Sequence, residues 1–227
     1  MADPAGGGEA VFRICHAGVE MLPVDGASIS AVRDGAERET LYATDEIIAR
    51  VESLQFTLGE GPCHEACASR RPVLVPDLSI APQTRWPVFV SEIDGLPIGA
   101  IYAFPIQYGA VDIGVLDLYR RHIGWLTDTE LNTALQIVDL AAGALLGAQS
   151  ETVHDTDGRG LKVWLAPLPR NRAEIHQATG ILVAALGIPA EQALARLRSY
   201  AFTTDSVVED IANDIVNRRT EPVVFDT

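Results

Sequence analysis

The sequence predicts an α+β fold, in which a domain built on an antiparallel sheet is followed by a small all-α domain of three helices. Residues 98–106 and 111–119 flank a turn-forming segment, and the second of them alternates in polarity, as strands of a β-hairpin do. Residues 131–145 instead carry apolar side chains three and four positions apart, which is typical of a helix packed along one face. Beyond residue 160 the apolar spacing is helical throughout.

Composition limits the class of protein. The chain has 227 residues, 48% of them hydrophobic, which is enough to bury the core of one large domain or two small ones. It contains no apolar run long enough to cross a bilayer, and its first residues lack the pattern of a secretory signal. We therefore expect a cytoplasmic protein without a membrane partner, in which Cys15, Cys63 and Cys67 are reduced thiols.

The net charge of −14 is distributed unevenly along the chain. Residues 161–227 carry seven basic and eight acidic side chains, so a net charge of −13 lies in residues 1–160. This asymmetry favours two domains. An acidic first domain is a poor binder of polyanions, and the composition of the near-neutral second domain does not by itself support nucleic-acid binding.

Local signals define the elements of the first domain. Asp34-Gly35 is a strong turn signal, and Thr127 with Glu130 forms a capping box, whose side chains satisfy free N–H groups at the start of a helix. The expected elements in chain order are a helix over 9–22, a hairpin of strands 27–32 and 39–43, a helix from Asp45, a loop over 59–62, a short helix over 63–69, a strand over 73–75, a loop-rich stretch over 79–97, the hairpin of 98–119, and a helix from Thr127 to about Ala148.

We place the first domain at residues 9–148, a linker at 149–160 and the second domain at 161–220. The linker contains glycine and acidic side chains without apolar periodicity. The three helices of the second domain are expected from about Arg170 to a stop at Gly187, from Pro189 onward, and from a capping box of Ser206 and Glu209 onward.

The helix that closes the first domain carries an apolar seam with alternating spacings of four and three. Its members are Leu131, Leu135, Val138, Ala142 and Leu145. Such a seam suits packing against another helix, so we expect a homodimer.

The second domain resembles the ANTAR domain over about residues 162–218. The resemblance rests on Arg172-Ala-Glu-Ile-His-Gln-Ala-Thr-Gly180, on Leu197-Arg-Ser-Tyr-Ala201, and on Ile211-Ala212. It implies a three-helix module that binds paired stem-loops in nascent transcripts and prevents termination. The candidate RNA-contacting residues are Arg172, Thr179, Gly180, Arg198 and Ala201. The chain departs from the family at Thr179, where a lysine that could contact phosphate is usual, so we expect weak and salt-dependent binding.

Residues 9–148 look like a GAF domain. The resemblance rests on the order of elements, on the loop Gly59-Glu-Gly-Pro-Cys63 and on Pro72-Val-Leu-Val-Pro-Asp77. It implies an antiparallel sheet with helices packed on it and a pocket for a small ligand, while the Asn-Lys-x-x-x-Phe-x-x-x-Asp-Glu pattern of cyclic-nucleotide-binding members is absent. The candidate pocket residues are Cys63, His64, Cys67, Tyr102 and Asp117. The ligand is an unidentified small molecule, and no cofactor is indicated.

Metal binding and catalysis are both disfavoured. Zinc needs four converging ligands, and free cysteines more often act as small buried hydrophobes, so we predict no metal site. Free methionine-(R)-sulfoxide reductases of GAF fold carry a loop like Gly59–Cys63, but their chemistry needs a second cysteine, and residues 86–93 hold none. We predict that the chain is not an enzyme.

Together these features predict a signal-responsive regulator of transcription antitermination. The first domain would sense a small ligand or a redox change, alter the packing of its final helix and reposition the paired RNA-binding domains. An upstream signalling protein is a further expected class of partner. The alternative is a protein-interaction module that does not bind RNA, which the near-neutral second domain and Thr179 favour.

Overall fold

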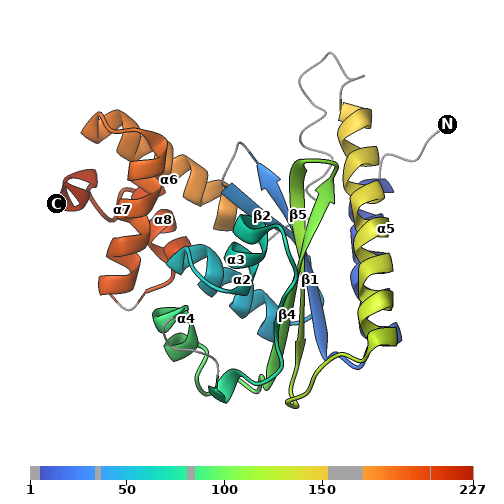
Figure 1. The fold of residues 1–227 in the computed structure, drawn as a ribbon. Coiled ribbons are helices and arrows are strands. Elements are labelled where there is room, and N and C mark those ends of the chain that lie inside the picture. The colour runs from blue at the N-terminus through green and yellow to red at the C-terminus, as the bar shows by residue number, and fades with distance from the viewer. Residues whose placement is uncertain (1–5, 34–36, 81–84, 153–170, 205, 227) are drawn as a thin grey trace. The chain divides into compact units, whose positions relative to one another are not determined.

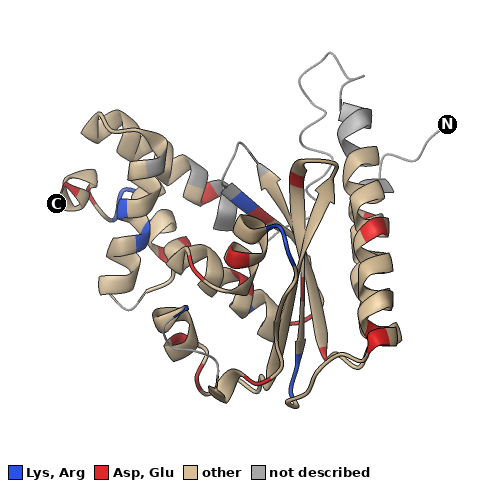
Figure 2. Ribbon diagram, viewed as in Figure 1, with Lys and Arg blue, Asp and Glu red and all other residues tan. Residues whose placement is uncertain are grey.

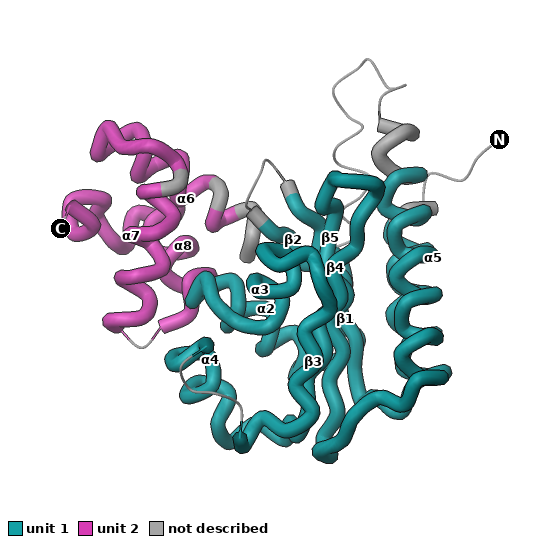
Figure 3. The backbone as a smooth tube through the Cα atoms, viewed as in Figure 1, with its two compact units in different colours: residues 1–166 teal, residues 167–227 magenta. Residues whose placement is uncertain are grey.

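A computed structural model describes residues 6–33, 37–80, 85–152, 171–204 and 206–226. The chain divides into two compact units, residues 1–166 and 167–227 (Figure 3). The first unit contains a sheet with helices on both faces, and the second is helical, as the sequence predicts. None of the helices in the described ranges combines the length and apolarity that crossing a membrane would require.

The first unit is built on five strands in the order β2-β1-β5-β4-β3, and every neighbouring pair is antiparallel (Figure 1). The strands are β1 (Gly26–Arg33), β2 (Glu37–Ala43), β3 (Val73–Val75), β4 (Ala100–Tyr108) and β5 (Val111–Arg120). The predicted hairpin forms β4 and β5 at the centre of the sheet. The predicted turn at Asp34-Gly35 lies outside the described residues, although the two strands that it joins do pair.

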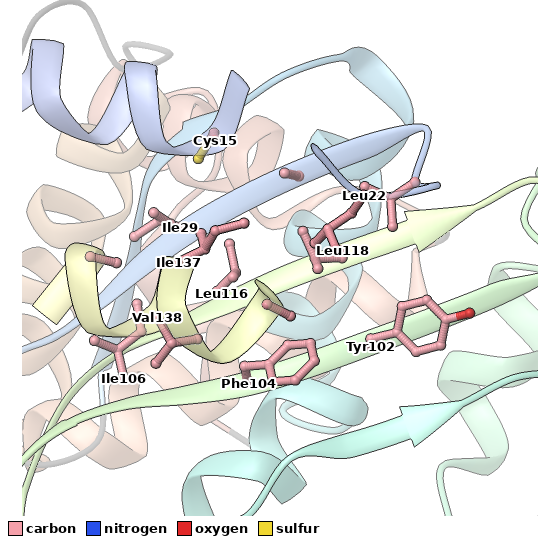
Figure 4. Close-up of a cluster of buried hydrophobic side chains, with 14 of the residues drawn as sticks. Cys15, Leu22, Ile29, Tyr102, Phe104, Ile106, Leu116, Leu118, Ile137 and Val138 are labelled. Carbon is pink, nitrogen blue, oxygen red and sulfur yellow. The ribbon is translucent and has the colours of Figure 1, made fainter. Parts of the chain in front are cut away.

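Helices cover both faces of this sheet. The helices α1 (Gly6–Met21) and α5 (Asp128–Thr152) contact each other and one face, whereas α2 (Glu46–Leu58), α3 (Pro62–Ser69) and α4 (Pro87–Glu92) lie on the other side (Figure 1). The core beneath α1 and α5 is apolar, and Figure 4 shows Ile29, Phe104, Leu116 and Ile137 meeting there.

Two predicted helix starts are confirmed by their hydrogen bonds. Asp45 caps α2 by accepting bonds from Ile47 N and Ile48 N at 2.8 and 2.9 Å. At α5, Thr127 N donates to the Glu130 carboxylate at 2.7 Å, and Glu130 N donates to Thr127 Oγ1 at 3.3 Å. The capping box is therefore formed.

The stretch 79–97, expected to be loop-rich, contains a helix. The helix α4 begins with Pro87, and a 3₁₀ turn, η1 (Leu78–Ile80), precedes it. The N-terminus of α4 is capped from a distant loop, because Glu60 Oε1 accepts hydrogen bonds from Val88 N at 2.8 Å and Phe89 N at 2.7 Å. No local signal could have shown this cap.

The second unit contains α6 (Asn171–Leu186), α7 (Ala190–Thr203), α8 (Val208–Val216) and a short 3₁₀ helix, η3 (Pro222–Phe225). Gly187 ends α6 with a φ of 66°, as predicted. The capping box predicted for the third helix does not form: Val207 is the N-cap, and Ser206 Oγ donates instead to Thr204 O at 3.1 Å. The sequence did not predict η3.

The apolar seam on α5 faces the sheet more than the solvent. Val138 and Leu145 are buried in the core, whereas Leu135 is 40% exposed. The most exposed leucine of this helix is Leu140, which lies outside the seam and is 65% exposed. The helix also extends to Thr152, so residues 149–152 of the predicted linker are helical, and residues 153–160 lie outside the described ranges.

Candidate functional site

A cluster of buried and partly buried polar side chains lies between the sheet and α2. We call it the polar cluster; its members are Ser28, Thr40, Glu52, Gln55 and Asp117. Glu52 accepts hydrogen bonds from Ser28 Oγ at 2.8 Å and from Thr40 Oγ1 at 3.0 Å. Buried polar groups are stable only when hydrogen-bonded, and these bonds tie β1 and β2 to α2.

Gln55 links the polar cluster to α3. Its Nε2 donates to Asp117 Oδ2 at 2.9 Å, and its Oε1 accepts a bond from Cys63 N at 2.8 Å. Gly61 makes this contact sterically feasible, because a Cβ at that position would lie 2.7 Å from Gln55 Oε1 and the residue has a φ of 128°. The Gly-Glu-Gly-Pro-Cys loop therefore positions α3 over the sheet.

Arg38 and His64 form the partly exposed rim of this region. Nη1 of Arg38 donates to Cys63 O at 3.1 Å, and its Nη2 contacts His64 Nδ1. A guanidinium can only donate, so Nδ1 is the acceptor. His64 Nε2 donates to Gln55 O at 2.9 Å. His64 is therefore held as the neutral tautomer with its proton on Nε2.

Asp117 is the most strongly perturbed carboxyl group of the described residues. It is fully buried, and this burial raises its pKa well above the usual range; the neighbouring Glu52 raises the pKa further. Its Oδ1 and the Oγ of Ser30 are buried atoms for which the described part of the chain provides no hydrogen-bond partner. These two atoms leave hydrogen-bonding capacity inside the polar region.

Burial favours the protonated thiol at all three cysteines. Burial raises the pKa of Cys63 well above 9.0, and burial also raises that of Cys67. Cys15 lies in the core beneath α1, where burial raises its pKa to about 12. A thiol is a poor nucleophile and reacts slowly with oxidants, so these environments do not favour redox sensing.

One predicted pocket residue lies on the wrong face of the sheet. Cys63, His64, Cys67 and Asp117 lie on the side of α2 and α3, but Tyr102 packs beneath α1 and α5 (Figure 4). Successive residues of a strand point to opposite faces. In the register Ala103 pairs with Asp117, so Tyr102, one residue earlier, faces away from that carboxyl group. There its hydroxyl donates to Gly124 O at 2.5 Å.

A concave pocket of about 510 Å³ lies beside α4. Its lining comes from η1, α4 and the segment that leads into β4: Leu78, Ser79, Pro87, Val90, Ser91, Ile93, Asp94, Gly95, Leu96 and Ile98. None of the predicted pocket residues contributes to it. The volume is within the usual range of small-molecule sites, and the surface of the pocket is more polar than apolar, although most of its lining side chains are apolar.

Some of the predicted RNA-contacting residues are buried in the core of the second unit, and others lie at its surface. Thr179 is 7% exposed, and its hydroxyl donates to Ile175 O at 2.7 Å, while Ala201 is fully buried. Both side chains belong to the core, so neither can contact RNA, which corrects the prediction. Gly180 is exposed and Arg198 is partly exposed. The side chain of Arg172 lies outside the described set.

Sequence reasoning missed an exposed aromatic residue on α7. Phe202 is 52% exposed and lies one helical turn after Arg198, so the two side chains share a flank of the helix. In the sequence, Phe202 could have been recognised as an apolar residue that lies outside the buried stripe formed by Ala193, Leu197 and Ala201.

Charged side chains of one sign do not gather at the candidate ligand sites or at the candidate RNA-contacting residues. Figure 2 shows acidic residues along α5 and around α2 and α3, and a mixture of both signs in the second unit. No group of three or more metal-binding side chains occurs among the residues that the structure describes.

Two family profiles match the chain. The profile of the GAF domain matches residues 9–146, and that of the ANTAR domain matches residues 169–216. None of the curated proteins matches the sequence.

Solved structures share the fold of the first unit. A domain of a putative two-component sensor histidine kinase from Sinorhizobium meliloti is 19% identical with a TM-score of 0.52, over 64% of this chain and 94% of its own. The third GAF domain of Slr1393 from Synechocystis is 14% identical with a TM-score of 0.52, over 65% and 98%. The GAF domain of an Acinetobacter phosphoenolpyruvate-protein phosphotransferase is 13% identical with a TM-score of 0.51, over 67% and 88%. At these identities the likeness concerns the fold alone.

Proposed function

Since the chain belongs to the GAF domain family and carries an ANTAR domain after it, we propose that it is a signal-responsive RNA-binding regulator of transcription antitermination. The observation that supports this most directly is the joining of a sensory type of domain to an RNA-binding type of domain in one chain. The protein acts in the cytoplasm as a homodimer, and an upstream signalling protein is a further partner.

The sensory step of this proposal is binding of a small ligand rather than oxidation. The three cysteines are buried or half-buried thiols with raised pKa values, which makes them slow to react. A ligand has two places to bind on the same side of the sheet. One is the 510 Å³ pocket, and the other is the polar cluster, where Asp117 Oδ1 and the Oγ of nearby Ser30 have unused hydrogen-bonding capacity. The same thiols argue against a reductase.

The RNA-binding step uses exposed and partly exposed residues of α6 and α7. Arg198 supplies a guanidinium for phosphate, Phe202 supplies a ring on which an unpaired loop base can stack, and Gly180 leaves room for the backbone of RNA. Arg172 is proposed from the resemblance alone. Because the domain is close to neutral, binding is weak and strongly dependent on salt.

This function is tested by titrating labelled transcripts that carry two adjacent hairpins at low salt. We expect the Arg172→Ala/Arg198→Ala variant to bind about ten-fold more weakly than the wild type. Arg218→Ala/Arg219→Ala is the matched control, since it removes the same two charges from the same unit, and Arg219 is already paired with Asp214 at 2.8 Å.

Equal binding by the wild type and the double variant would refute the proposed surface. Absence of binding at every salt concentration, also with any co-purified small molecule retained, would refute RNA binding and favour the protein-interaction module. The exposed ring of Phe202 would then be a candidate protein contact.

A further inference from the structure

The segment after α8 folds back onto the output domain. Arg218 has a φ of 57°, in the left-handed region, and the chain reverses there, with Arg219 N donating to Asp214 O at 2.7 Å. Residues 217–226, which we call the return segment, lie beyond the ANTAR profile match. The helix η3 within this segment contacts both α6 and α7.

The return segment is anchored by an aromatic contact. Phe225 is only 1% exposed, and its ring lies 4.6 Å from that of Tyr200 on α7, measured between centroids. Burying an aromatic ring is the main apolar gain available to so short a segment. The adjacent Val223 and Val224 remain exposed, so the segment is attached chiefly through one side chain.

The same segment accepts hydrogen bonds from a basic side chain of α7. Arg196 Nη1 donates both to Phe225 O at 2.8 Å and to Asp226 Oδ1 at 3.0 Å. The Arg196 side chain is 29% exposed and that of Asp226 is 64% exposed, so the ion pair is open to solvent and to competing anions. Through the Asp226 carboxylate, the return segment thus offers Arg196 the interaction that an RNA phosphate would offer.

We infer that the return segment is an autoinhibitory latch, in which Asp226 and Phe225 hold Arg196 away from RNA. This inference rests on the proposed RNA-binding function and extends its surface, because Arg196 lies two residues before Arg198 and therefore on another flank of α7. In the latched state one of the few cations of a near-neutral domain is neutralised, and RNA must displace Asp226 to use it. Release of the segment frees the Arg196 guanidinium and uncovers Tyr200, whose ring can stack on a base.

The ion pair between Arg196 and Asp226 is weak enough to be displaced, whereas the buried ring of Phe225 keeps the rest of the segment attached. An exposed ion pair is screened by salt and contributes little to stability, so its exchange for a phosphate contact is close to balanced. Removing Asp226 should therefore raise RNA affinity without unfolding the domain. Removing Phe225 would release the segment more fully but also delete a buried ring, so that variant is a poorer first test.

The test is a double-mutant cycle on the full chain with the dual-hairpin transcript at low salt. We expect Asp226→Asn to raise the affinity about two- to five-fold in the wild-type background and to have no effect in the Arg196→Ala background. Glu221→Gln is the matched control, because it neutralises an exposed acidic side chain of the same segment, whereas Arg196 Nη1 bonds to Phe225 O and Asp226 Oδ1. Thermal unfolding followed by circular dichroism should show the same midpoint for Asp226→Asn as for the wild type.

Three results overturn the latch while leaving RNA binding intact. Equal gains from Asp226→Asn and Glu221→Gln would indicate a general charge effect, and a gain that persists with Arg196→Ala would show that Arg196 is not the site. A loss of affinity in Asp226→Asn would show that the segment supports binding instead. If no variant binds RNA under any condition, the proposed function itself fails, and the latch fails with it.

Discussion

At the scale of single residues, the buried carboxyl group of Asp117 is the least usual feature of the sensory domain. A carboxylate is costly to bury, and it stays in the protein because Gln55 donates to one oxygen and because its raised pKa keeps it protonated beside Glu52. The folded state therefore holds a proton that the unfolded state releases once the pH exceeds the ordinary pKa of aspartate.

This proton predicts how stability depends on pH. Between the unfolded pKa and the raised folded pKa of Asp117 the folded state binds more protons, so its stability falls as the pH rises through that window. Asp117→Asn removes the titration and keeps both a donor and an acceptor. We expect the variant to exceed the wild type in free energy of unfolding at about pH 8 and to lose this advantage towards about pH 4.

The measurement is urea unfolding at several pH values. Asp139→Asn, on the exposed side of α5, is the matched control and should follow the wild-type pH profile. An Asp117→Asn variant that loses stability as steeply as the wild type with rising pH would contradict the assignment of the proton to this carboxyl group.

The structure places three of the predicted pocket residues on one side of the sheet: Cys63 and His64 follow the Gly59–Cys63 loop, and Asp117 lies in β5. That they bind a ligand stays a prediction. Tyr102 was misplaced because its orientation depends on strand register, which a run of mostly apolar residues does not reveal. Thr179 and Ala201 were misplaced because the family pattern does not separate core positions from contact positions.

At the scale of elements, α4 shows how distant contacts can define a helix. It is six residues long and begins with Pro87, and two of its free N–H groups are satisfied by Glu60, more than twenty residues earlier. We expect Glu60→Ala to lower the free energy of unfolding by about 1 kcal/mol, because a helix cap is lost. Chemical denaturation measures this change.

Glu92→Ala is the matched control for this cap, since Glu92 is exposed at the last turn of the same helix. It should change stability little. If both alanine variants unfold at the wild-type midpoint, the Glu60 cap contributes nothing.

Prediction of elements followed the same division between local and distant causes. The central hairpin and the Thr127 capping box involve residues close in sequence, and both were predicted. The helix α4 and the return segment depend on partners that are distant in the sequence, so no local pattern predicted them. The Ser206 box failed because the serine hydroxyl bonds backward to Thr204 O, which competes with capping.

The prediction of a homodimer rests on the exposed side of α5. Leu140 is 65% exposed, and Leu135, which lies five residues earlier and points to another side of the helix, is 40% exposed; we propose that these two side chains contact a second copy of the helix. Light scattering at micromolar concentration should give about twice the 24.4 kDa mass of one chain. The Leu135→Glu/Leu140→Glu variant should give 24.4 kDa, and the Leu135→Met/Leu140→Met control should stay dimeric. A wild-type mass of one chain would refute the interface.

At the scale of the whole molecule, the two units have different chemistry. The first is strongly acidic and contains the pocket and the polar cluster, whereas the second is near neutral and presents Arg198 and Phe202. A domain with so little positive charge gains only a small electrostatic contribution from one RNA hairpin. Useful affinity then requires two domains acting on one transcript.

This requirement leads to a prediction that connects assembly with RNA binding. In a dimer, once one domain has bound a hairpin, binding of the adjacent hairpin by the second domain becomes intramolecular, and affinity rises without any new contact. We expect the wild type to bind a dual-hairpin transcript at least about ten-fold more tightly than a single hairpin at the same salt concentration. The monomeric Leu135→Glu/Leu140→Glu variant keeps every RNA-contacting side chain, so it should bind the single hairpin like the wild type and gain nothing beyond a statistical factor from the second hairpin.

Fluorescence anisotropy titrations of the wild type and the monomeric variant, each with the single and the dual hairpin, give the comparison. The methionine variant is the control for substitution at these positions. If the monomer retained the dual-hairpin preference, both hairpins would be bound by one domain; if the dimer lacked the preference, pairing of the domains would serve some purpose other than reading two stem-loops.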